Sequence, residues 1–150
     1  MFHEVVDGRG SGPDVDADEP AAAELLAAFE TLVSEPAAEV DLDRLVGEIG
    51  LSEADASDLR DGDVAALSLS DGAAVLAAAN PDRDAVAMVA EVRDHLLMGM
   101  ATAVLDVDSI AAKIDADLTG QEVQQALEGR TTLTLGQLAE ILAVIERRKP

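Results

Sequence analysis

Apolar residues recur at spacings of three and four along most of the chain, which is the period of an amphipathic α-helix. The longest stripes lie in residues 21–34, 84–105 and 136–148. Shorter helical stretches lie between them, each bounded by capping or turn-forming residues: 42–49, 53–61, 70–79, 109–114 and 120–128. The pattern therefore predicts an all-α protein of about eight helices.

The N-terminal part of the chain departs from this pattern. Residues 7–20 are rich in Asp, Gly and Pro, a composition typical of loops. We therefore predict an N-terminal arm and acidic loop over residues 1–20. Pro36 is expected to end the first helix, because the residue before a proline disfavours the helical region.

Two stretches, 40–76 and 107–145, carry the same series of signals. In each, a short helix and a turn lead to a hydroxyl N-cap, Ser52 or Thr119, and to a second short helix. That helix ends at Gly62 or Gly129, and a Leu-Ser-Leu or Leu-Thr-Leu segment follows. We predict two related units, 21–80 and 82–148, packed as one compact helical bundle. The alternative is chance similarity between two stretches rich in Ala and Leu.

Each unit resembles the helix-turn-helix of Cro/CI, or lambda-repressor-like, regulators. The matching positions in the first unit are Leu45, Val46, Ile49, Gly50, Leu51, Ser52, Ala56, Leu59 and Gly62. Those in the second are Ile110, Ala111, Ile114, Leu118, Thr119, Val123, Ala126 and Gly129, with a turn that is longer. The whole sequence is also similar to an uncharacterised, single-domain family of halophilic archaea. The resemblance implies a DNA-binding or transcription-regulatory protein, often a dimer.

A recognition helix reads bases with donors and acceptors on its exposed face, and glutamine suits adenine. The second unit offers Thr119, Gln121, Gln124 and Gln125 there, with Arg130, Arg147 and Arg148 as candidate phosphate contacts. The corresponding face of the first unit is acidic. We therefore expect any binding of double-stranded DNA to involve the second unit. The simpler interpretation is a solvated helix surface, with Arg147 and Arg148 stabilising a helix C-terminus.

Charge and composition narrow the functional classes. The net charge is −21, and residues 1–105 carry −18 of it, against −3 for residues 106–150. Acidic residues occur along most of the chain, which indicates a protein of a high-salt cytoplasm, where salt screens their mutual repulsion. The alternative is an acidic protein that binds basic partners. There is no cysteine, no apolar run of membrane-spanning length, and no nucleophile–base pattern. We expect no enzyme, no metal, no cofactor and no membrane partner.

These expectations leave two functions open. The first is a DNA-binding regulator that reads through the second unit. The second is an acidic helical module for protein interaction or dimerisation, in which the fold persists without DNA binding; the partner is then a second copy or another regulatory protein. Met88, Met98 and Met100, all in the 84–105 stretch, are expected to fill the core or an interface.

Overall fold

The computed structural model describes residues 18–114 and 117–148. Within these ranges all regular structure is helical, which confirms the all-α prediction. The helices are α2 (Asp18–Ala37), α3 (Leu42–Gly47), α4 (Glu53–Arg60), α5 (Leu69–Ala79), α6 (Ala85–Ala103), α7 (Val107–Lys113), α8 (Gly120–Leu127) and α9 (Leu135–Arg148).

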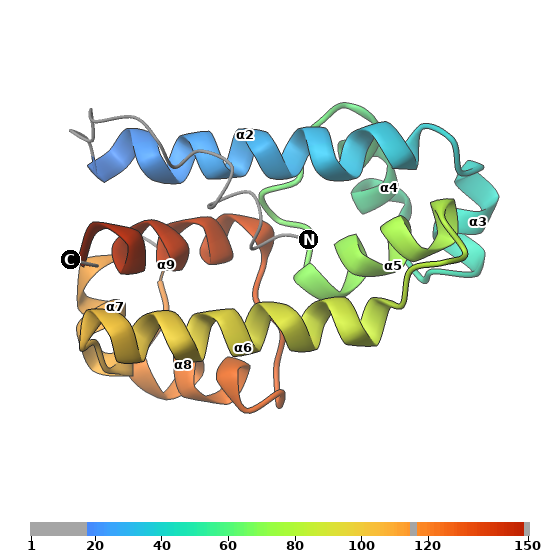
Figure 1. Cartoon of the computed structure of the whole chain (residues 1–150). Coiled ribbons are helices and arrows are strands. Elements are labelled where there is room, and N and C mark those ends of the chain that lie inside the picture. Colours follow the sequence, from blue (N-terminus) through green and yellow to red (C-terminus); the bar gives the residue numbers. More distant parts are fainter. Residues whose placement is uncertain (1–17, 115–116, 149–150) are drawn as a thin grey trace.

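Four longer helices, α2, α5, α6 and α9, form the body of the molecule (Figure 1). α9 packs along α2 and α6, and α5 packs along the same two helices. The short helices lie at the ends: α4 packs on α2 and α3 on α4, while α8 packs on α6 and α7 on α8 and α9. α9 is the most enclosed helix, because eight of its 14 residues are buried. A helix that is apolar on most sides belongs inside the core.

One core serves the whole bundle. The buried residues of the ranges 22–80 and 85–148 form a single cluster, which includes Phe29 from α2, Leu76 from α5 and Leu138 from α9. Aliphatic side chains dominate this cluster, and leucine is the most frequent of them. The two predicted units are therefore not separate hydrophobic bodies, and the compact bundle predicted from the sequence is confirmed.

A short antiparallel contact joins the two Leu-Ser/Thr-Leu segments. Leu69 N donates to Leu133 O and Leu135 N donates to Leu67 O, each at 2.8 Å. Ser68 and Thr134 stand opposite each other in this bridge. Each also caps the helix that follows it, since its hydroxyl accepts a backbone N–H three residues later.

The segments matched in the sequence repeat are thus paired with each other at the centre of the fold. The order of a long helix, two short helices and another long helix occurs in both halves. The contacts follow the same order, because α2 packs on α9 as α6 packs on α5. An origin of the two halves by duplication stays a prediction.

The first helix is longer than predicted at both ends. α2 begins at Asp18, so the prediction of a loop through residue 20 is wrong for its last three residues, while 1–17 lie outside the described part. It also continues past Pro36 to Ala37. Ala37 and Val40 are buried, and Ala38 N still donates to Ser34 O at 3.1 Å. Burial of these residues outweighs the single hydrogen bond that Pro36 removes.

Other helix starts shift by one or two residues because the capping residue lies further upstream. α7 begins at Val107, not at residue 109, and its N-cap is Asp106. The Asp106 carboxylate accepts a hydrogen bond from Ser109 N at 2.8 Å. That hydrogen bond favours the ionised form and lowers the pKa of Asp106 below its ordinary value.

Candidate functional site

The predicted recognition helix of the second unit is α8. Its buried side is formed by Val123, Ala126 and Leu127. Gln121 and Gln124 are exposed and Gln125 is half-buried, so the three glutamines lie on the side away from the core. This is where a base-reading face would have to be.

Acidic residues occupy much of that face. Thr119 forms a reciprocal capping box with Glu122, in which its hydroxyl accepts from Glu122 N and its own N–H donates to Glu122 Oε1. Gln124 Nε2 donates to Glu128 Oε2 at 3.4 Å, and Arg130 Nε lies 3.7 Å from Glu128 Oε1. Three of the predicted DNA contacts are therefore engaged with Glu122 or Glu128, and both carboxylates would repel phosphate.

The N-terminus of α8 also faces an acid. Gly120 is buried, and a Cβ at this position would collide with the Asp108 carboxylate. The positive end of the α8 dipole is thus next to a negative side chain of the protein itself. A recognition helix normally directs this end at DNA.

The predicted phosphate contacts fall into two places. Arg147 and Arg148, at the end of α9, border a cavity of about 320 Å³ together with Lys113 at the end of α7. Arg130 follows the C-terminal end of α8 and lines a different cavity, together with residues of α6. The structure therefore groups Arg147 and Arg148 with each other and places Arg130 elsewhere.

The outward face of α6 is the feature that sequence reasoning missed. Val86 is 80% exposed, Met98 71% and Leu97 48%, although each is apolar. Met88 and Met100, by contrast, are buried. The signal was present in the sequence, since α6 has more apolar residues than one inward stripe needs. We call the residues Val86, Ala90, Leu97, Met98 and Ala101 the α6 outward face.

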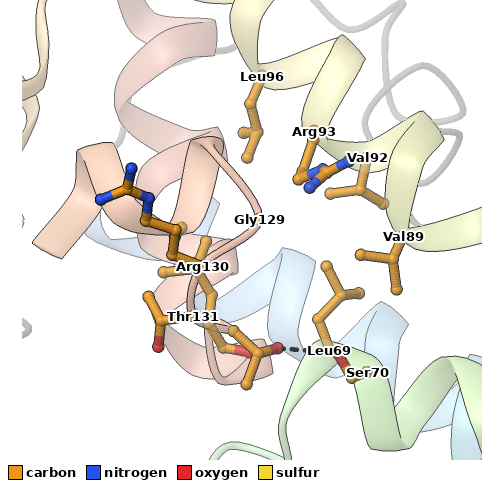
Figure 2. A pocket seen from close by; sticks show the side chains of 12 residues that line it. Leu69, Ser70, Val89, Val92, Arg93, Leu96, Gly129, Arg130 and Thr131 are labelled. Atoms are coloured by element: carbon orange, nitrogen blue, oxygen red, sulfur yellow. Dashed lines mark hydrogen bonds between the residues drawn. The ribbon is translucent and has the colours of Figure 1, made fainter. Parts of the chain in front are cut away.

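A cavity of about 250 Å³ opens beside this face, between α6, the first turn of α5 and the connection from α8 to α9 (Figure 2). Leu69, Val89, Val92, Leu96 and Leu133 give it an apolar wall. Ser70, Thr131 and Thr132 supply hydroxyl groups, and the Ser70 and Thr132 oxygens lie 3.2 Å apart.

Arg93 reaches into this cavity from α6, while Arg130 at its edge directs its guanidinium away from Arg93 (Figure 2). The Arg93 guanidinium lies directly against Gly129, in space that a Cβ at residue 129 would fill. Its Nε atom is buried, and no described residue accepts a hydrogen bond from it. A buried N–H without an acceptor is rare in folded proteins.

The described ranges contain no group of three or more His, Cys, Asp or Glu residues placed to hold a metal ion. They also contain no single helix that is both long and apolar enough to cross a membrane. α6 and α7 meet that test only when taken together, and the chain bends by 92° between them.

Comparison with known proteins identifies a family and no function. No curated protein and no solved structure matches the chain. Residues 25–148 match a family of unknown function, DUF5791. The match runs from Leu25 in α2 to the end of α9 and includes the α6 outward face and the cavity beside it. The chain therefore belongs to the DUF5791 family.

Proposed function

We propose that this protein is an acidic helical self-association module of a high-salt cytoplasm, which pairs with a second copy through the α6 outward face. The observation that carries this proposal is the exposure of Val86, Leu97 and Met98 on one helix. Exposed large apolar residues that cluster on one face mark interaction sites more often than isolated ones do.

The order of residues along α6 suits a second copy. An antiparallel pair with its two-fold axis between residues 93 and 94 sets Val86 opposite Ala101 and Ala90 opposite Leu97. Each of these pairs joins a smaller side chain to a larger one, which favours close packing. Self-complementarity of this kind is what a two-fold interface requires.

Salt determines when such a pair forms. Two chains with a net charge of −21 each repel one another in dilute buffer. At about 1 M salt the Debye length is about 3 Å, so the repulsion is screened while the apolar contact remains. Dimerisation is therefore expected to strengthen with KCl concentration.

A glutamate on the α6 outward face tests the proposal. Met98→Glu is expected to weaken the dimer about tenfold or more at molar KCl, because it would bury a charge without a partner. Size-exclusion chromatography with light scattering measures the change.

The matched control is Ala54→Glu, which adds the same charge to an exposed position of α4. It should leave the dimer unchanged. A wild-type chain that stays monomeric at every KCl concentration contradicts the proposal, and so does equal weakening by both variants.

DNA binding through α8 is the second candidate, favoured by the outward placement of Gln121, Gln124 and Gln125. Here the double variant Gln124→Ala and Gln125→Ala should reduce retention on genomic DNA fragments in molar KCl. The salt response separates the two functions, because DNA binding weakens as salt rises. Retention that is absent in the wild type, or equal in the variant, removes this candidate.

A further inference from the structure

The geometry points to a binding site for a small carboxylate with an aliphatic group, in the cavity between α6, α5 and the α8–α9 connection. This site goes beyond the proposed self-association. Its ligand would place the carboxylate on Arg93 and its aliphatic group against the wall formed by Val92, Leu96 and Leu133.

The lining of the cavity has the opposite charge to the protein. About one residue in five of the whole chain is acidic, yet none of the 12 residues that line the cavity is. Arg93 is the cation that faces inward (Figure 2). The first turn of α5 borders the same space through Leu69 and Ser70, so the positive end of its dipole adds to the attraction. A carboxylate is therefore favoured here over any cation.

Arg93 has a hydrogen-bond donor that the described protein leaves unused. Its buried Nε–H finds no acceptor among the described residues, and a donor in that state destabilises the fold. A carboxylate would accept from a guanidinium in a two-bond, planar arrangement. The Ser70 and Thr132 hydroxyls at the rim hydrogen-bond to each other, and Thr132 also donates to Leu133 O, so the selection of a carboxylate rests on Arg93.

The size and walls of the cavity select the rest of the ligand. A volume of about 250 Å³ corresponds to roughly eight water molecules. Five aliphatic side chains enclose it, so a branched or short linear hydrocarbon group fits better than a sugar or a nucleotide. This chemistry has two sources, a free short-chain acid and the C-terminal residue of a polypeptide.

The test follows the Arg93 Nε–H resonance by ¹H–¹⁵N NMR in about 2 M KCl, a salt level at which surface charges are screened. The probes are 3-methylbutanoate, which represents a free acid, and N-acetyl-leucine, which represents a polypeptide C-terminus. All measurements use the Met98→Glu variant, in which self-association is weakened. A negative result for the binding site is therefore independent of the outcome for the proposed dimer.

Both probes are expected to shift this resonance, and the tighter of the two identifies the source. In calorimetry Arg93→Gln should weaken binding about tenfold or more, because it removes a charge-assisted hydrogen bond. Arg44→Gln, on the exposed surface of α3, is the matched control and should bind as before. Val89→Phe, which fills the cavity and keeps the charge, should also lose binding.

Three outcomes would overturn the site. One is equal binding of acetate and 3-methylbutanoate, since the apolar wall would then contribute nothing. The second is binding of 3-methylbutanamide as tight as that of the acid, since the guanidinium would then not select a carboxylate. The third is no binding of either probe.

Discussion

Replacing Leu138 by alanine is expected to lower the free energy of unfolding by about 2–5 kcal/mol, the usual range for a buried leucine truncated to alanine. Leu138 is fully buried in α9, and α9 packs on α2, α5 and α6. The cavity left behind would therefore weaken helices from both halves of the chain. Thermal unfolding followed by circular dichroism in molar KCl measures the loss.

The distribution of this loss matters as much as its size. Since the fold has one core cluster, amide hydrogen exchange should accelerate in α2 and α4 as much as in α8. Leu97→Ala is the matched control; Leu97 is 48% exposed, so the change should stay within about 0.5 kcal/mol in the monomer. Faster exchange confined to α6–α9 would show two independent units instead of one core.

Gly129→Ala is expected to destabilise the fold for two reasons that can be separated. Residue 129 has φ of +79°, where a non-glycine residue is strained by about 1–2 kcal/mol. In addition, the new Cβ would displace the Arg93 guanidinium from its position against the backbone. The variant should therefore lose more than the backbone strain alone, and Arg93 Nε–H should shift in the NMR spectrum.

Gly50→Ala isolates the backbone contribution. Gly50 has φ of +90°, but nothing lies within 4 Å of a Cβ built on it. The difference between the two variants in unfolding midpoint thus reports the Arg93 contact. If both variants lose the same stability, the contact with Gly129 does not hold the Arg93 side chain in place, and this account of the cavity would be contradicted.

Local signals in the sequence were enough to predict most of the fold. Ser52 and Thr119 are N-caps, and Gly50, Gly62 and Gly129 have positive φ, as their residue types indicate. The passage of α2 through Pro36 was not predictable, because it depends on the burial of Ala37 and Val40 by distant residues. Tertiary packing can override a local stop signal in this way.

The candidate site was less accessible from the sequence. The exposure of Gln121 and Gln124 follows from the helical period, but their neighbours Glu122 and Glu128 weaken the DNA interpretation only once the side-chain contacts are known. The meeting of Arg93 with Gly129 joins residues 36 positions apart, for which no local pattern exists. The one usable signal in the sequence was that α6 contains more apolar residues than a single inward stripe needs. This surplus indicates a second apolar face on the helix.

Disulfide trapping across the two-fold axis tests the proposed α6 pairing most directly, because the chain contains no cysteine of its own. A variant with Ala90→Cys and Leu97→Cys is oxidised in molar KCl and compared with Ala90→Cys alone. The two new thiols of one chain lie about 10 Å apart along the helix, too far to bond with each other. The antiparallel pair predicts a covalent dimer for the double variant and a monomer for the single one. A dimer from the single variant at the same rate, or no dimer from either, would contradict it.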